Sequence, residues 1–193
     1  DRQANNGRFP SVGASNWQGA FQATEYLIRL GHRRIGYIGG WEDMDSSRER
    51  LAGYQAALSA HHVAFDAQLA LPGTFQQMDG YHGTLQLLDL AQPPSAIFTG
   101  NDMMAFGAID AARARGLRVP EDLSVLGFDD IPQARFARPA LTTVRQPLEQ
   151  IGRVGTQIVL DMMKNPGSPF RNVELPTELV VRELATGAAT TIA

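Results

Sequence analysis

Polar and aromatic side chains recur in this chain just after short apolar runs of the kind that form buried strands. A guanidinium donates up to five hydrogen bonds, a carboxylate accepts several, an amide does both, and an aromatic face covers the apolar face of a ring. Vicinal hydroxyls need that mixture, so these residues predict a site for a small polyhydroxylated molecule. They are Asn16, Trp17, Ser46, Arg50, Phe75, Asn101, Asp102, Asp129 and Asp130.

A structural interpretation stands beside this one for several of the same residues. Ser46, Asn101 and Asp102 also fit as helix caps, and Asp129 also fits a turn. Taken singly, each residue fits its structural role better than a ligand role. Agreement among five loops favours a shared ligand site.

Other chemistries have weaker support. The run Gly36-x-x-Gly39-Gly40 follows a strand but lacks both the G-x-G-x-x-G spacing and a Walker lysine and serine, so we interpret it as a turn. The pair Asp129-Asp130 has no nearby histidine or third carboxylate to complete a metal site. The sequence also has no G-x-S-x-G elbow and no convincing serine, histidine and aspartate set. We therefore expect no enzyme activity, no cofactor and no metal.

Composition limits the partners. The 193 residues are 44% hydrophobic and 19% charged, with a net charge of −3 and no cysteine. No apolar run is long enough to cross a bilayer, and the net charge gives no field that attracts a nucleic-acid backbone. We expect a globular, cytoplasmic chain that has no membrane partner and does not itself bind DNA.

The candidate residues require elements that bring them together. Apolar residues alternate between short strand-like runs and stretches of helical period, which predicts at least four consecutive βα units. Such units form a doubly wound parallel sheet with helices on both faces, whose strand-end loops meet at one rim. Ser46 and Glu49 have the spacing of a capping box for the second helix. The predicted strands are residues 9–14, 35–38, 69–71, 96–99 and 124–128.

The alternation of strand-like and helical segments ends after Asp130. An irregular stretch with two prolines leads to a short strand at residues 141–144 and to an amphipathic helix from Pro147. That helix is expected to end at residues 165–167, before short strands at 173–175 and 179–181. This change predicts a second lobe.

Several motifs resemble one family. They are Gly31-His32-Arg33-Arg34-Ile35, Ser46-x-Arg48-x-Arg50-x-x-Gly53-Tyr54, Pro94-Ser95-Ala96-Ile97-Phe98 before Asn101-Asp102, Gly116-Leu117-Arg118-Val119-Pro120-Glu121-Asp122-Leu123-Ser124-Val125, Gly127-Phe128-Asp129-Asp130, and Leu141-Thr142-Thr143-Val144-Arg145-Gln146-Pro147. The chain resembles the effector-binding region of LacI/GalR-type transcriptional regulators over nearly its whole length.

The resemblance implies an architecture similar to periplasmic sugar-binding proteins, in which two α/β lobes are joined by three crossovers and an effector lies between them. One lobe is expected to be largely missing here, together with the N-terminal helix-turn-helix that binds operator DNA in the family. The implied domains are residues 1–16 as a remnant of the first lobe, 17–145 as the effector-binding second lobe, 146–176 as a return into the first lobe, and 177–193 as a final strand of the second lobe plus a tail.

The resemblance also implies roles for residues. Arg50, Asn101 and Asp129 correspond to polar effector ligands, Phe75 to a wall of the site, and Gln146 to a crossover near the cleft. With Trp17 and Ser46 from the loops above, they complete the candidate ligand-binding set. Where family members often carry Asp-Asn, this chain has Ser15-Asn16. The effector identity therefore stays open: a sugar fits best, and a purine or a phosphorylated sugar is an alternative.

The function implied is that of a sensor. Effector binding in the cleft would be coupled allosterically to operator binding by a repressor, through the absent DNA-binding domain. The family also implies a homodimer, with contacts from the helix that carries Phe106 and Asp110 and from residues 135–137. The alternative is a periplasmic sugar-binding protein of a transporter, which shares the architecture.

Overall fold

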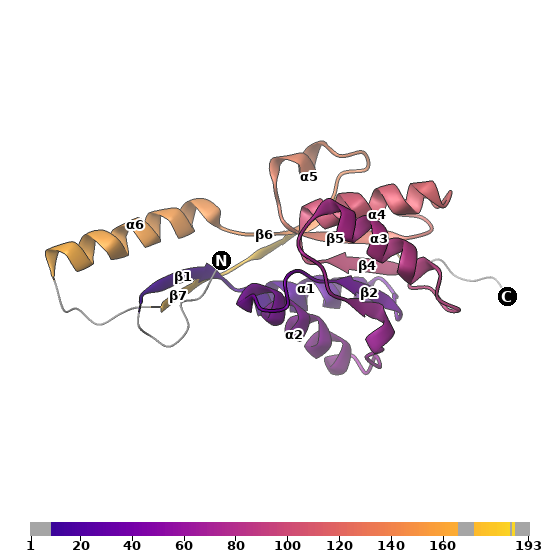
Figure 1. Cartoon of the computed structure of the whole chain (residues 1–193), viewed down its shortest axis with the longest axis horizontal. Coiled ribbons are helices and arrows are strands. Elements are labelled where there is room, and N and C mark those ends of the chain that lie inside the picture. The colour runs from indigo at the N-terminus through magenta and orange to yellow at the C-terminus, as the bar shows by residue number, and fades with distance from the viewer. Residues whose placement is uncertain (1–8, 166–171, 186, 188–193) are drawn as a thin grey trace.

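The computed structural model describes residues 9–165, 172–185 and 187. Most of the chain forms one body around a six-stranded sheet, from which β1, β7 and α6 project to one side (Figure 1). The strands are β1 (Ser11–Ala14), β2 (Ile35–Ile38), β3 (Ala70–Leu71), β4 (Ala96–Thr99), β5 (Ser124–Asp129), β6 (Thr142–Arg145), β7 (Asn172–Leu175) and β8 (Glu178–Val180). The helices are α1 (Asn16–Arg29), α2 (Asp45–Ala60), α3 (Gln77–Leu88), α4 (Asp102–Ala114), α5 (Pro132–Phe136) and α6 (Leu148–Lys164), with a 3₁₀ turn at Ala67–Leu69.

The larger sheet has the strand order β3-β2-β4-β5-β6-β8. Its first five strands are parallel, which confirms the doubly wound sheet predicted from the βα rhythm. The edge strand β8 differs, because it runs antiparallel to β6. The segment between β7 and β8 contains no helix, so the chain re-enters the sheet at the carboxyl end of β6, where Glu178 faces Arg145, and runs the opposite way.

Strand residues alternate between two apolar cores. In β4, Ile97 faces the core under α3 and α4, whereas Ala96 and Phe98 face the core under α1 and α2. Burial on both faces explains the continuous apolar runs of the central strands in the sequence. Helices therefore pack on both faces of the sheet, and the sheet fixes the positions of the loops that follow its strands.

The predicted capping box of α2 is wrong. The helix begins one residue before Ser46, its N-cap position is Met44, and no side chain caps it. Ser46 thus lies inside the first turn and is buried. The capping prediction for α4 is confirmed, because the Asn101 Oδ1 accepts a hydrogen bond from the Met104 N–H at 2.9 Å.

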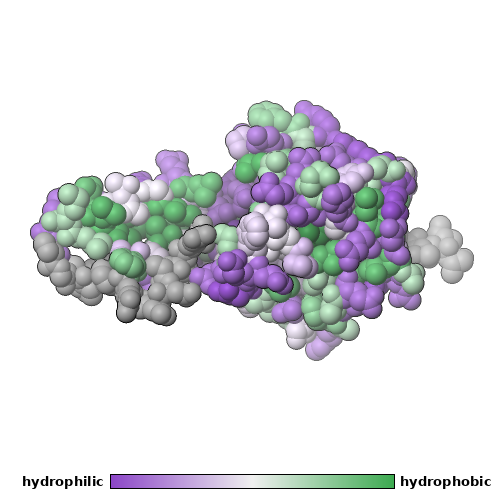
Figure 2. Space-filling view, viewed as in Figure 1, coloured by the Kyte–Doolittle hydropathy of each residue, from purple (hydrophilic) through white to green (hydrophobic). Residues whose placement is uncertain are grey.

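The projecting part is built from β1, near the start of the chain, and from α6 and β7, which precede the return of the chain to the larger sheet as β8. Strands β1 and β7 pair in parallel, with Val12 opposite Val173. Helix α6 packs on β1 and has no buried residue along its length. Apolar side chains gather on its surface (Figure 2). The domain boundaries expected from the resemblance stay a prediction, and the helix end expected at residues 165–167 lies partly outside the described residues.

Among the described residues, we find no helix that combines the length and the apolar character needed to span a membrane.

Candidate functional site

The candidate site lies where the chain order in the sheet reverses. Strand β2 is flanked by β3 on one side and β4 on the other, so the connections that follow β2 and β4 diverge at their carboxyl ends. Open α/β sheets bind ligands in the crevice at such a switch point. Here a cavity of about 420 Å³ occupies that position, and it is lined by Val12, Met44, Ser46, Arg50, Phe75, Asn101, Asp129, Gln146, Leu148 and Ile151.

The structure brings six of the seven predicted site residues to this one cavity: Ser46, Arg50, Phe75, Asn101, Asp129 and Gln146. They come from α2, from the last residue of β5, and from the segments that follow β3, β4 and β6. Val12, Leu148 and Ile151 add apolar wall from the projecting part of the molecule. The cavity therefore lies between the larger body and the β1-β7-α6 part.

Arg50 is the central cation of the site. Its side chain is only 4% exposed. Its Nε–H donates to the Asn16 Oδ1 at 3.0 Å, and its Nη1 donates to the carbonyl of Gly100 at the end of β4. Its guanidinium carbon lies 3.8 Å from the centre of the Phe128 ring, a cation–π contact. Burial lowers the pKa of Arg50, but an arginine stays protonated in proteins, so the cavity keeps a fixed positive charge.

Asp129 supplies the opposite charge. Its Oδ1 lies 3.8 Å from the Nη1 of Arg50 and accepts a hydrogen bond from the Gln146 Nε2 at 2.6 Å. Burial raises the pKa of Asp129, while Arg50 and Gln146 counteract that rise. A carboxylate held this way can accept hydrogen bonds from ligand hydroxyls with its second oxygen, next to the guanidinium that donates them.

Phe75 and Asn101 form a second wall. The Phe75 ring lies directly over Gly40, where an added Cβ would be only 2.0 Å from Cζ. Asn101 holds this loop in place, because its Nδ2 donates to the Phe75 carbonyl at 3.1 Å while its Oδ1 caps α4. The cap and the ligand role are therefore compatible in one side chain.

Backbone strain coincides with the site. Phe75 has φ of 64° and Asp129 has φ of 117°, both in the region that side chains other than glycine rarely adopt. Such conformations cost on the order of 1–3 kcal/mol and are found disproportionately at functional sites. Two further non-glycine residues with positive φ, His62 and Asp130, do not line the cavity, so the strain supports the site at Phe75 and Asp129 but does not by itself define it.

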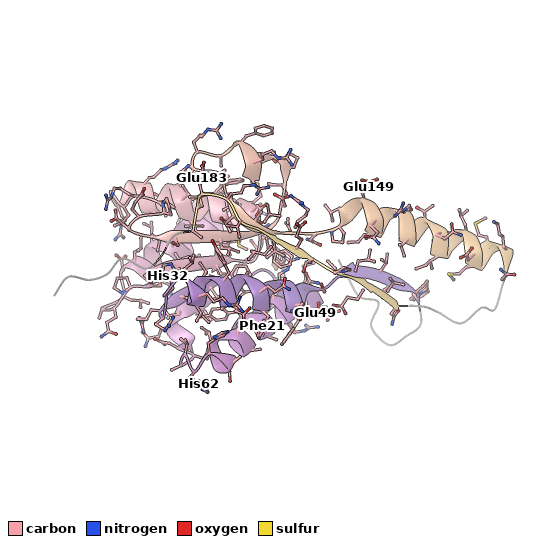
Figure 3. All side chains as sticks on the ribbon, turned by 180° about the vertical axis from the view of Figure 1, so that it is seen from behind. Phe21, His32, Glu49, His62, Glu149 and Glu183 are labelled. Atoms are coloured by element: carbon pink, nitrogen blue, oxygen red, sulfur yellow. The ribbon has the colours of Figure 1, made fainter. Side chains whose placement is uncertain are left out.

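Trp17 is the predicted residue that the structure places differently. Its ring stacks on Phe21 of the same helix with centroids 5.3 Å apart, and its side chain is 41% exposed. The preceding residue, Asn16, contacts the site instead, through Arg50. Asn16 is buried, accepts from Arg50, and donates to the Glu49 Oε2 at 3.0 Å. Figure 3 shows Glu49 beside the point where β1 and β7 leave the larger body.

Sequence reasoning missed one group that supports the site and did not predict the contacts of another. Phe128 faces Arg50 from β5, and its place in a buried apolar run gave no signal of that contact. Asp102 was expected at the rim or as a helix cap, and neither expectation included its contacts with β6 and with the loop after β5. Its buried carboxyl accepts from the Thr143 Oγ1 at 2.5 Å and from the Ile131 N–H at 2.9 Å, so it ties the loop after β5 to α4 and β6.

Asp130 does not line this cavity. Its carboxylate pairs with Arg145 and Arg182, each at 2.6 Å. Burial opposes ionisation, but these hydrogen bonds outweigh it and hold the pKa of Asp130 below its usual range. Across the described ranges, we find no group of three or more histidine, cysteine, aspartate or glutamate side chains placed to hold a metal ion.

Comparisons with known proteins agree with this fold. The model of the periplasmic binding protein-like domain family matches residues 24–183. The HTH-type transcriptional repressor CytR of Escherichia coli (strain K12) is 42% identical over 173 residues, which make up 90% of this chain and 51% of that protein. A solved complex of the transcriptional regulator CelR with cellobiose has a TM-score of 0.89 at 38% identity, covering 93% of this chain and 55% of the other. A LacI family regulator from Enterococcus faecium with bound ribose has a TM-score of 0.90 at 28% identity, covering 97% of this chain and 69% of the other.

A doubly wound sheet with a polar cavity at its switch point defines a ligand-binding α/β domain. Because the family model matches most of its length, the chain belongs to the periplasmic binding protein-like domain family. The relatives are regulators of the LacI type, which confirms the resemblance predicted from the motifs. The chain spans about half the length of the curated relatives it matches.

Proposed function

We propose that this chain is the effector-sensing part of a LacI-type transcriptional repressor and that the cavity around Arg50 and Asp129 binds a sugar or a sugar-like molecule. Binding there would change the operator affinity of a longer protein that carries a helix-turn-helix. The observation that carries the proposal is the convergence of Arg50, Phe75, Asn101, Asp129 and Gln146 on one cavity. The ligand roles of these residues are part of the proposal.

The chemistry of the cavity favours a polyhydroxylated ligand. Arg50 and Asp129 place a donor and an acceptor side by side, so that two neighbouring hydroxyls can be bound together. Phe75 offers an apolar face for the face of a sugar ring. Two structural neighbours are described with cellobiose and with ribose, which supports the sugar class. A purine and a phosphorylated sugar remain the alternative ligands, because the guanidinium of Arg50 also suits an anion.

The coupling mechanism follows from the position of Gln146. This residue contacts Asp129 and lies two residues before α6, which belongs to the projecting part. A ligand that binds Asp129 and Gln146 together would favour one position of that part relative to the six-stranded sheet. Differential affinity for two such positions is what an allosteric regulator needs, and typical coupling free energies are about 1–3 kcal/mol.

Partners and location follow from the same proposal. The relatives are named as transcriptional repressors, which favours a regulator over a transporter's binding protein and over an enzyme. We propose a homodimer with contacts near Phe106, Asp110 and residues 135–137, where Phe136 is 72% exposed. A regulator acts on chromosomal DNA, which supports the cytoplasmic location expected from the sequence.

The proposal is tested by ligand binding to the 193-residue chain. Ribose, cellobiose, glucose 6-phosphate and adenine are titrated by calorimetry and by thermal shift. We expect a sugar to bind, and Asp129→Asn and Arg50→Lys to weaken it about ten- to a hundredfold, because charge-assisted hydrogen bonds contribute about 1.5–3 kcal/mol.

The matched control is Arg118→Lys, which changes an exposed arginine that pairs with Asp122 away from the cavity. This variant should bind the sugar as the unmodified chain does. Equal affinity in all three variants, or no binding of any of the four compounds, would overturn the proposal.

A further inference from the structure

A chain of hydrogen bonds joins Glu49, labelled in Figure 3, to the central cation of the site. The Glu49 Oε2 accepts from the Asn16 Nδ2 at 3.0 Å, and the Asn16 Oδ1 accepts from the Arg50 Nε at 3.0 Å. Glu49 and Arg50 are neighbours on α2, whereas Asn16 begins α1. Arg50 lines the sugar cavity, which is the cavity around Arg50 and Asp129, but Glu49 does not. Glu49 is therefore connected with that cavity through Asn16.

The direction of the Asn16 amide is set by the acceptors on its nitrogen side. The Nδ2 group donates to the carbonyl of Ala14 at 3.1 Å as well as to Glu49, so both of its hydrogens are used. A reversed amide would place its oxygen against a carbonyl and a carboxylate, and its NH₂ group against the Arg50 guanidinium. Of the two acceptors, the carboxylate forms the stronger, charge-assisted hydrogen bond. Glu49 therefore contributes most to keeping the Asn16 oxygen directed at Arg50.

The contact with Asn16 is one of three that orient the guanidinium of Arg50. The Nη1 donates to the carbonyl of Gly100, and the guanidinium carbon lies 3.8 Å from the centre of the Phe128 ring. A cation–π contact does not specify rotation within the plane of the guanidinium, so the Nε and Nη1 hydrogen bonds together fix that rotation. The other N–H donors of Arg50 are then held in one direction for Asp129 and for a ligand.

We propose that Glu49 is a positioning residue of the sugar cavity: its carboxylate fixes the Asn16 amide, and the amide holds the Arg50 guanidinium in the orientation that binds the ligand. The effect on ligand affinity rests on the proposed function. The orientation of Arg50 does not, because it is a property of the ligand-free chain.

The charge of Glu49 acts through the same hydrogen bond. The charged groups that face it are Asp45 and Arg50 on α2 and Glu174 on β7. Burial raises the pKa of Glu49, and the charges of Glu174 and Asp45 add to that rise. The hydrogen bond from Asn16 and the charge of Arg50 oppose it. Glu49 therefore takes up a proton at a higher pH than an ordinary glutamate does, and its hydrogen bond with Asn16 then loses the assistance of the charge.

The first test measures the hydrogen exchange of the Arg50 Nε–H by NMR in the ligand-free 193-residue chain. In the unmodified chain this N–H is buried and bonded to Asn16, so it should exchange slowly. Glu49→Ala should speed the exchange about fivefold or more, the equivalent of about 1 kcal/mol. Glu49→Gln should restore slow exchange, because its amide oxygen still accepts from Asn16.

The matched control is Glu25→Ala, which removes another carboxylate that connects the same two helices. The Glu25 Oε1 lies 3.0 Å from the His61 Nε2 at the end of α2, and neither residue lines the sugar cavity. Glu25→Ala should leave the exchange of the Arg50 Nε–H unchanged. Unchanged exchange in Glu49→Ala, or the same increase in Glu25→Ala, would overturn the proposal.

The second test measures sugar affinity by calorimetry. Glu49→Ala should weaken binding about fivefold near pH 7, and Glu49→Gln should restore most of the affinity. Acidification to about pH 5 should weaken binding less in Glu49→Gln than in the unmodified chain, because the amide cannot be protonated there, while Asp129 titrates in both.

Equal sugar affinity in Glu49→Ala and the unmodified chain, or parallel pH profiles of the unmodified chain and Glu49→Gln, would overturn the positioning role. If no sugar binds to the unmodified chain, the proposed function fails instead. The exchange of the Arg50 Nε–H then decides by itself whether Glu49 holds the guanidinium, so the two failures are distinguishable.

Discussion

Asp102 is a carboxyl group enclosed between α4, the loop after β5 and β6, with no exposed side-chain surface. Burial raises its pKa to about 7, although hydrogen bonds from Thr143 and Ile131 oppose that rise, and the neighbouring charges of Asp129 and Asp130 add to it. The group that joins three elements behind the site is therefore poised to change its charge near neutral pH.

The pH dependence of stability follows from the sign of this shift. Below the pKa of the unfolded chain, about 3.9, both states hold the proton and the full stability is present. As the pH rises toward 7, the unfolded state releases the proton first, so the folded state loses stability, on the order of 4 kcal/mol for a change of about three pKa units. We expect urea midpoints to fall from pH 5 to pH 8.

Asp102→Asn tests that prediction at the same residue. The amide keeps one acceptor for the Ile131 N–H and gives a donor for the Thr143 hydroxyl, but it cannot ionise. This variant should flatten the fall in urea midpoint between pH 5 and pH 8. Asp122→Asn is the control, because hydrogen bonds from Arg118 lower the pKa of that exposed carboxylate to about 2, so Asp122 does not change its charge between pH 5 and pH 8. An unchanged slope in Asp102→Asn contradicts the assignment.

At the level of single elements, the start of α4 combines a helix cap with a wall of the cavity. Asn101 performs both tasks through different atoms, because its Oδ1 accepts from Met104 and its Nδ2 donates to Phe75. The helix therefore positions the strained Phe75 loop as well as itself. Substitutions at this residue separate stability from ligand binding.

Asn101→Asp keeps the acceptor and removes the donor. We expect little loss of stability, because aspartate is an equally good N-cap, together with weaker sugar binding caused by a looser Phe75 loop. Asn101→Ala removes both contacts and should cost about 1 kcal/mol of unfolding free energy in addition to the lost affinity. Urea denaturation and calorimetry on both variants check this. Equal sugar affinity in Asn101→Asp and the unmodified chain would show that Phe75 needs no support from Asn101.

What the sequence could predict at this level depends on how far apart the interacting residues lie. The Asn101 cap involves residues three positions apart, so its local pattern was sufficient. The contact of Asn16 with Arg50 spans 34 residues, and the strand pattern alone did not distinguish Asn16 from Trp17. The direction of β8 depends on where the chain returns from the projecting part, which no local period encodes. The alternation of βα units was enough to predict the shared rim.

For the molecule as a whole, α6 is the helix whose apolar surface is least covered in the described structure. It is an amphipathic helix with no buried residue, and its apolar side chains include Leu148, Val159, Leu160 and Met163, each more than 40% exposed. The sugar cavity borders the same part, through Leu148 and Ile151. The relatives are about twice as long as this chain, so in a protein of their length further residues are available to cover α6.

This exposure predicts opposite effects of one substitution in two chains. In the 193-residue chain, Leu160→Ser should reduce binding of a hydrophobic dye and self-association, because it removes exposed apolar surface. In a protein of the relatives' full length, the same change should lower the unfolding free energy by about 2–5 kcal/mol, as loss of a buried leucine does. Gln157→Ser, on the same helix at an exposed polar position, should change neither property. If Leu160→Ser leaves the stability of the longer protein unchanged, α6 is exposed in that protein too. The proposed sugar-dependent coupling requires the two parts to move relative to each other through packed surfaces. An exposed α6 would contradict that mechanism.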